Sequence, residues 1–89
     1  MIKVKYHIDG LVQGVGFRYF IYQNAVQLGL KGFAKNNYDG SVSATIEGAV
    51  EIVEKFESLI KLGPSRSQVR SFKRVEQSFS GEFTRFEIY

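Results

Sequence analysis

The 89-residue sequence contains no cysteine, no tryptophan, one histidine and one proline. Without cysteine, the chain can form no disulfide framework, no thiolate nucleophile and no cysteine-ligated zinc or iron–sulfur cluster. Because His7 is the one histidine, it cannot supply a multi-histidine metal site, and any histidine-dependent acid–base scheme must use it. The chemistry that remains available is that of backbone groups, arginine and lysine, amides, hydroxyls and carboxylates.

Long hydrophobic runs are also missing. No stretch of about 18 apolar residues occurs, and the first patterned segment begins at Met1–Ile2, which leaves no room for a signal peptide. We therefore expect a cytoplasmic protein without a membrane segment. The composition is that of an ordinary globular domain, with 44% hydrophobic, 15% aromatic and 24% charged residues and a net charge of +3. The length predicts a single domain over residues 1–89.

The hydrophobic period changes from two to about 3.6 within the first half of the chain. Residues 2–9 alternate between apolar and polar, which predicts a strand with one buried face. After a glycine-rich interruption, apolar residues recur every three or four positions over 17–28, as in a helix. Residues 33–36 and 42–46 are expected to be strands, and the Asn-Tyr-Asp-Gly segment at 37–40 predicts a turn between them.

The second half repeats the order of helix and strand. A helix is expected to open at Gly48, with acidic residues in its first turns and Lys61 near its end, and to stop at Gly63–Pro64. A strand is expected within 68–76, where the irregular alternation indicates a bulge or an edge position. A short strand at 86–88 closes the chain.

The resulting order of elements is β-α-β-β-α-β with one possible extra strand. This order predicts an α+β fold of the ferredoxin-like type, a two-layer sandwich. In it, an antiparallel sheet of four to five strands carries two helices on one face. Because this topology supports many functions, the site must decide the activity.

The segment between the first strand and the first helix carries three glycines, Gly10, Gly14 and Gly16, followed by Arg18. Glycine lets consecutive N–H groups turn toward one point, and the first N–H groups of a helix have no partner within it. Together with a guanidinium group, these features suit a phosphate. On spacing alone, a tight turn with Arg18 as a solvated charge remains an equal alternative.

Two familiar glycine motifs do not fit this loop. No Lys-Ser or Lys-Thr pair follows it, so it is not a Walker A loop. The third glycine of a dinucleotide fingerprint is missing, and the chain is too short for that fold.

The loop closely resembles the G-x-V-Q-G-V-x-F-R signature of the acylphosphatase family, since residues 10–18 read GLVQGVGFR. A second family block, L-G-L-x-G-W-V-x-N-x-x-D-G-x-V, has its counterpart in LGLKGFAKNNYDGSV at 28–42. The sequence departs from the family pattern at three positions. Phe33 stands where Trp is usual, Ala34 where Val is usual, and Ser43 where many members have an acidic residue.

The resemblance implies an enzyme that hydrolyses the carboxyl–phosphate bond of acyl phosphates without a cofactor or metal. It implies that Arg18 and the N–H groups of the loop bind the phosphoryl oxygens and that Asn36 orients the attacking water. The loop residues concerned are Gln13, Gly14, Val15, Gly16, Phe17 and Arg18. The expected partners are a small acyl phosphate and inorganic phosphate as product and inhibitor, and the protein is expected to be a monomer.

Three other features allow different interpretations. The β-α-β-β-α-β order and the basic residues Arg66, Arg70, Lys73 and Arg74 are compatible with RNA binding, but a solvated edge strand explains the charges better. His7 lies in the polar register of the first strand and is expected to be a surface residue without a catalytic role. Acylphosphatase-like domains also begin larger carbamoyl-transfer maturation proteins, whereas we expect this chain to be complete.

Overall fold

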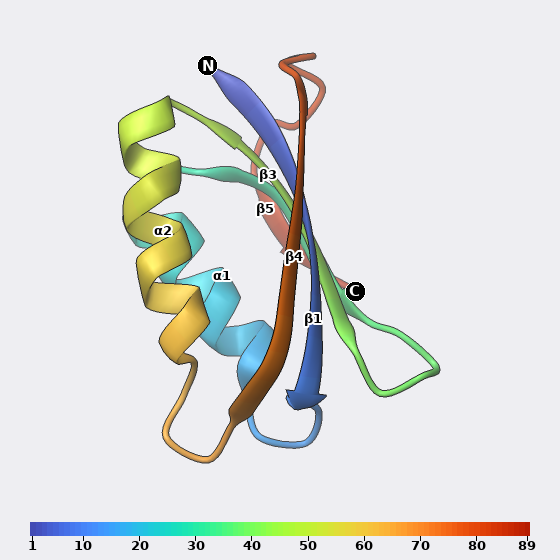
Figure 1. The fold of residues 1–89 in the computed structure, drawn as a ribbon. Coiled ribbons are helices and arrows are strands. Elements are labelled where there is room, and N and C mark those ends of the chain that lie inside the picture. Colours follow the sequence, from blue (N-terminus) through green and yellow to red (C-terminus); the bar gives the residue numbers. More distant parts are fainter.

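The computed structural model describes all 89 residues and contains five strands and two helices, which form two layers (Figure 1). The elements, in chain order, are β1 (Ile2–Leu11), α1 (Phe17–Gln27), β2 (Lys31–Asn36), β3 (Val42–Gly48), α2 (Val50–Leu62), β4 (Gln68–Ser78) and β5 (Phe86–Ile88). The strands form one sheet in the order β4-β1-β3-β2-β5, and both helices cover the same face (Figure 1). The predicted ferredoxin-like α+β fold is confirmed.

The core lies between the helices and the covered face of the sheet. Strand residues at every second position point into it, as the alternation predicts, and each helix adds one stripe. The contributors from β1, α1 and α2, all at most 3% exposed, are Val4, Tyr6, Ile8, Phe17, Ile21, Ala25, Val53, Phe56 and Ile60. Neither helix is long and apolar enough to cross a membrane.

β4 occupies one edge of the sheet and carries a bulge, as predicted. It pairs only with β1, and the register shifts between Asp9, which faces Ser71, and Gly10, which faces Val69. The expectation that Gly10 would interrupt the first strand was wrong. Gly10 stays within β1. A Cβ there would lie 2.0 Å from the main-chain oxygen of Gln68, so glycine is what permits the close approach of β4.

The sheet is not wholly antiparallel, in contrast to the prediction. β5 pairs in parallel with β2 at the opposite edge from β4. The chain reverses direction after β4 and crosses the end of the sheet, so its last strand runs in the direction of β2 (Figure 1). The predicted start of the second helix at Gly48 was also wrong. Gly48 ends β3, and Ala49 is the N-cap residue of α2.

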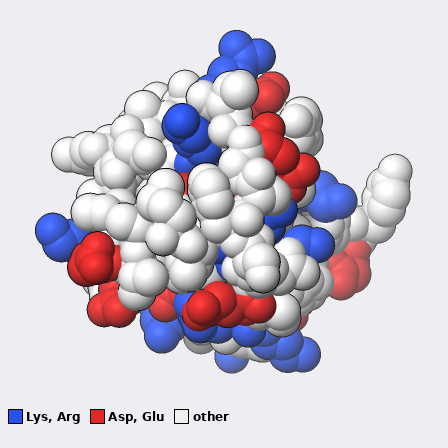
Figure 2. Space-filling model, turned by 90° about the horizontal axis from the view of Figure 1, so that it is seen from above, with Lys and Arg blue, Asp and Glu red and all other residues white.

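Charged side chains on the outside of the molecule are mixed in sign. Seen from above, Lys and Arg side chains are interleaved with Asp and Glu (Figure 2). On the edge strand, Arg74 pairs with Glu57 of α2, with 2.6 Å between Nε and Oε1, and lies 3.6 Å from Glu76. The basic run of β4 is therefore partly neutralised by its neighbours.

Candidate active site

The connection from β1 to α1 contains two glycines in left-handed conformations, Gly14 with φ 74° and Gly16 with φ 77°. A Cβ at either position would meet no atom within 4 Å, so steric crowding does not explain the choice of glycine. The positive φ explains it, because L-residues with side chains rarely adopt that conformation. The two glycines thus shape a loop with open space in front of it.

The loop leads directly into the N-terminus of α1. Gly16 is the N-cap residue and provides no side-chain cap, and the first turn holds no acidic residue. The N–H groups of Phe17, Arg18 and Tyr19 therefore have neither a helical nor a side-chain partner at this end. They carry part of the positive end of the helix dipole, which favours an anion.

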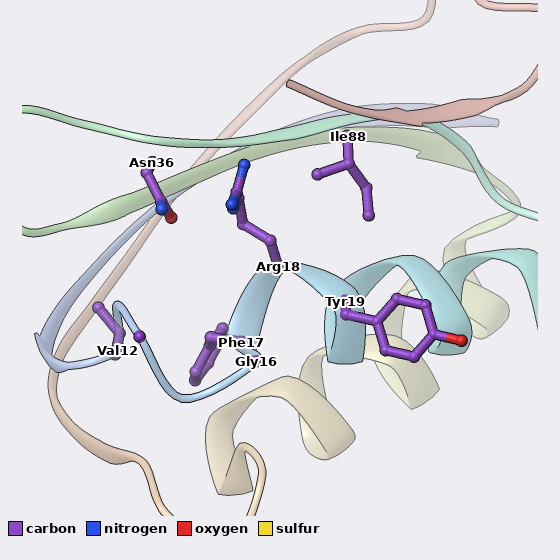
Figure 3. Close-up of a pocket in the computed structure, with 8 residues that line it drawn as sticks. Val12, Gly16, Phe17, Arg18, Tyr19, Asn36 and Ile88 are labelled. Carbon is purple, nitrogen blue, oxygen red and sulfur yellow. The ribbon is translucent and has the colours of Figure 1, made fainter.

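Arg18 extends from the first turn of α1 toward the sheet. Its guanidinium group lies between Asn36 and Ile88, above the loop that carries Gly16 (Figure 3). Nη1 donates a hydrogen bond to the main-chain oxygen of Tyr89, over a distance of 2.5 Å. This bond holds one end of the guanidinium, so that its other N–H groups stay available for an anion.

Asn36 is the last residue of β2, and its exposed side chain turns toward the same space (Figure 3). The parity of the strand explains the direction, since Ala34, two residues earlier, is buried beneath the helices. The space is a hollow of about 200 Å³, lined by Val12, Gly14, Gly16, Phe17, Arg18, Tyr19, Asn36 and Ile88. An amide, a guanidinium and a helix N-terminus therefore share one small cavity.

Two of the expected phosphate-binding residues do not line the hollow. The Gln13 side chain turns toward the β2–β3 turn, where Nε2 donates to the main-chain oxygens of Asn37 at 2.7 Å and Ser41 at 2.8 Å. Val15 is partly buried against the core. The side chain of Gln13 thus fastens the loop to the turn that follows Asn36.

The β2–β3 turn is itself held by local hydrogen bonds. Asp39 Oδ1 accepts from the N–H of Ser41 at 2.9 Å and from its hydroxyl at 2.5 Å, as predicted for a turn of this composition. These two bonds lower the pKa of the Asp39 carboxyl, since both stabilise the carboxylate. The turn that follows Asn36 is therefore held both by the Gln13 side chain and by the Asp39–Ser41 hydrogen bonds.

Several residues of the hollow were missed by sequence reasoning. Val12 and Tyr19 are sequence neighbours of the loop and of Arg18, so proximity could have indicated them. Ile88 lines the hollow from β5, and Tyr89, which follows it, accepts the hydrogen bond from Arg18; both lie about 70 positions from Arg18 in the sequence. No local signal points to them, because their position depends on the pairing of β5 with β2.

His7 takes no part in the hollow. It lies on the opposite face of the sheet, where its side chain is 42% exposed and Nε2 is 3.4 Å from Asp9 Oδ2. His7, Asp9 and Asp39 form a group of potential metal ligands within 4.8 Å of one another. None of the three lines the hollow of Arg18 and Asn36.

Comparison with known proteins gives a consistent result. The family model described as Acylphosphatase matches residues 4–88. An acylphosphatase of Syntrophotalea carbinolica is 41% identical over 87 residues, which cover 98% of this chain and 95% of that protein. The crystal structure of acylphosphatase from Bacillus subtilis superimposes with a TM-score of 0.96 at 35% identity, and covers 100% of this chain and 99% of that one.

The same fold also occurs within a larger protein. A crystal structure of full-length HypF in a phosphate- and nucleotide-bound form matches with a TM-score of 0.89 at 33% identity. The match covers all of this chain but 12% of that one. The relatives that match along their whole length are named acylphosphatase.

Proposed function

The chain belongs to the acylphosphatase family, which is a family of enzymes, and on that premise we propose that its hollow hydrolyses acyl phosphates with Arg18 and Asn36 in the principal roles. One observation carries this proposal. The glycine loop, the uncapped N-terminus of α1, the guanidinium of Arg18 and the amide of Asn36 meet in a single hollow of about 200 Å³. That set of groups offers many N–H donors and no acidic side chain.

In the proposed reaction, the substrate places its phosphoryl group against the loop and the start of α1. Main-chain N–H groups of residues 13–18 and the free N–H groups of Arg18 donate to the phosphoryl oxygens. Phosphoryl transfer depends mainly on positioning and on stabilisation of developing charge, which preorganised donors supply. The donor set of this hollow is suited to that task.

Water is the proposed nucleophile, and Asn36 positions it. The amide oxygen of Asn36 can accept a hydrogen bond from the water without acting as a strong base. The water oxygen forms the new bond to phosphorus while the bond from phosphorus to the carboxyl oxygen breaks. The products are a carboxylate and inorganic phosphate, and the surplus proton goes to solvent.

No general acid is needed for the leaving group. A carboxylate with a pKa of about 4.3 leaves as the anion at neutral pH. A phenol, with a pKa of about 10, leaves far less readily, so phenyl phosphate should be a much poorer substrate. The absence of a histidine or cysteine from the hollow is therefore compatible with the reaction.

Inorganic phosphate, as a product that retains the phosphoryl oxygens, is expected to bind the same loop and to inhibit. We further propose that the protein acts in the cytoplasm on a small-molecule substrate. We also propose that it is a monomer, since one copy supplies every group named above. Light scattering at the concentration of the activity assay checks the oligomeric state.

The direct test is the hydrolysis of benzoyl phosphate or acetyl phosphate by the purified protein in metal-free buffer. We expect turnover, inhibition by inorganic phosphate, and the same rate in EDTA. The Arg18→Ala protein serves as the matched control. Hydrolysis no faster than in buffer, together with no binding of phosphate, would reject the proposed function.

A further inference from the structure

A second hollow lies on the open face of the sheet, away from the helices. Its volume is about 410 Å³, twice that of the hollow beside Arg18. Side chains from four neighbouring strands line it, chiefly Lys5, His7, Phe33, Lys35, Thr45 and Lys73. A volume of this size lies within the range of small-molecule sites, about 300–1,000 Å³.

The register of the strands sets these residues in two adjacent rows. One row runs across the sheet from Lys73 through His7 and Ser43 to Lys35. Since neighbouring strands are about 4.8 Å apart, the backbones of its two terminal lysines are separated by about 14 Å. The next row contains Val75, Lys5, Thr45 and Phe33. A lysine in the middle of one row thus faces a pair of lysines at the ends of the other.

The lysines of this hollow have no acidic partner within the protein, although Asp9 and Asp39 lie close to His7, which also lines it. No Asp or Glu lines it, and Lys5, Lys35 and Lys73 take part in no salt bridge. Lys3 lies two residues before Lys5 on the same face of β1. Unlike the three lysines of the hollow, it forms salt bridges, with Glu47 and Glu82. Three unpaired lysines around one depression form a site of the charge that an anion requires.

The floor of the hollow adds an aromatic ring and a hydroxyl group. Phe33 is held by tilted contacts with Phe83 and Tyr89, whose ring centroids lie 5.8 and 5.6 Å away. Thr45 is only 6% exposed, and every fully buried polar side-chain atom of the protein has a hydrogen-bond partner. Thr45 lines the hollow and its hydroxyl forms no hydrogen bond within the protein, so that hydroxyl is not fully buried and stays free to donate or accept.

From this combination we infer that the open face of the sheet binds an organic phosphate of mononucleotide size, with its aromatic ring against Phe33 and its phosphates between Lys5, Lys35 and Lys73. Base stacking on an aromatic side chain needs no specific edge contacts, and lysines bind phosphate as point charges. Next to the hollow on the same face, Glu87 pairs in register with Phe33, and Lys3 is paired with Glu82. These acidic groups and the volume of about 410 Å³ favour a small ligand over a long polyanion.

This site is separate from the hollow of Arg18 and Asn36. Lys35 and Asn36 are consecutive residues of β2, and their side chains therefore point to opposite faces of the sheet. The two hollows share no lining residue. Binding at the open face should consequently survive both phosphate at the loop and the loss of Arg18.

Titration calorimetry with ADP in low-salt buffer tests the inference, with inorganic phosphate and adenosine as probes that each carry half of the ligand. We expect saturable binding of ADP that persists in the Arg18→Ala protein and in excess inorganic phosphate. Adenosine alone should bind at least about tenfold more weakly. Displacement of ADP by inorganic phosphate, or its loss with Arg18→Ala, would place the ligand at the loop and overturn the inference.

A pair of double variants with equal charge change gives the matched control. Lys5→Gln/Lys73→Gln removes two lysines of the hollow, whereas Lys31→Gln/Lys55→Gln removes two that lie outside it. We expect the first to weaken ADP binding about tenfold or more and the second by less than about twofold. Equal weakening would show attraction to overall charge only and would overturn the proposed site.

Phe33→Leu tests the aromatic contact, and is expected to weaken ADP at least about fivefold while leaving benzoyl phosphate hydrolysis measurable. Failure of ADP to bind, or preferential binding of a single-stranded RNA oligomer, would likewise overturn the inference. Because hydrolysis of acyl phosphates is measured separately, neither result bears on the proposed catalytic function.

Discussion

At the scale of single residues, two features of Arg18 suit it to bind an anion. It stands in the first turn of α1, beside the unpartnered N–H groups, and its guanidinium is anchored by the oxygen of Tyr89. We expect Arg18→Ala to cost at least about 3 kcal/mol of transition-state stabilisation, since one lost neutral donor in an oxyanion hole costs about 10²–10³-fold in kcat. The measurement is kcat/KM for benzoyl phosphate.

Arg18→Lys is the informative companion variant. It keeps the charge but removes the planar fork, which holds Tyr89 with one nitrogen and leaves others for the substrate. We expect a loss nearly as large as that of Arg18→Ala. If lysine restored most of the activity, charge alone would explain the role of Arg18, and the geometric argument would be wrong.

Asn36 has a different expected phenotype. Asn36→Ala should lower kcat and leave the affinity for inorganic phosphate nearly unchanged, because the amide is assigned to the water and not to the anion. Steady-state kinetics and the phosphate inhibition constant separate these effects. A variant that keeps its kcat but no longer binds phosphate would contradict the assignment.

At the scale of elements, glycines of the β1–α1 region serve two different structural purposes. Gly16 needs its positive φ of 77° but has free space around it, whereas at Gly10 a Cβ would meet the Gln68 oxygen at 2.0 Å. Gly16→Ala should therefore reduce the free energy of unfolding by about 1–2 kcal/mol, the cost of a left-handed L-residue. Gly10→Ala should reduce it by more, because β4 must also move.

Urea denaturation of both glycine variants, with activity measured in parallel, checks this prediction. Gly16→Ala is expected to lose a larger share of its activity per kcal/mol of lost stability than Gly10→Ala, because Gly16 lines the hollow and Gly10 does not. Equal losses of activity at equal stability would show that the loop conformation has no special importance.

An element could be predicted from the sequence when the residues that determine it lie close together in the chain. The β1–α1 loop and the 37–40 turn are local structures, and their glycines, Asn and Asp are sufficient to indicate them. The parallel pairing of β5 was not predictable, since only the path of the chain after β4 determines it. The contact from Arg18 to Tyr89 depends on that pairing and was missed for the same reason.

The same distinction applies to the side chain of Gln13. The family signature indicates that residue 13 belongs to the loop, yet its amide is used to hold the β2–β3 turn, 24 and 28 residues away. A sequence motif names a residue without showing which of its groups acts. The tertiary structure is what separates a main-chain role from a side-chain role at such a position.

At the scale of the whole molecule, the two ends of the sheet differ in what they do. One end carries the hollow, where β2 finishes and β3 begins. At the other end, buried Glu47 of β3 holds the segment between β4 and β5 by accepting hydrogen bonds from Ser80 N–H at 2.8 Å, Ser80 Oγ at 2.9 Å and Gly81 N–H at 3.2 Å. Lys3 lies 3.8 Å from the same oxygen. This cluster directs the chain from one edge of the sheet to the other.

Burial alone would raise the pKa of Glu47, but the bonds from Ser80 and Gly81 and the charge of Lys3 outweigh it, so the pKa lies below its ordinary value. The folded protein therefore binds a proton at Glu47 more weakly than the unfolded chain does. The stabilisation is fully present above about pH 4.3, the ordinary glutamate pKa, and is lost as the pH falls through the lower pKa of the folded state.

Glu47→Gln should consequently lower the free energy of unfolding by about 2 kcal/mol at pH 7, the scale of hydrogen bonds to a charged group. The difference from the unsubstituted protein should shrink as the pH falls below about 4.3. Urea denaturation between pH 7 and pH 3 measures it, with Glu54→Gln on the exposed face of α2 as the control for loss of one negative charge. A difference that stays constant with pH would contradict this prediction. It would show that Glu47→Gln lowers the stability through packing, and that the charge of Glu47 does not stabilise the segment between β4 and β5.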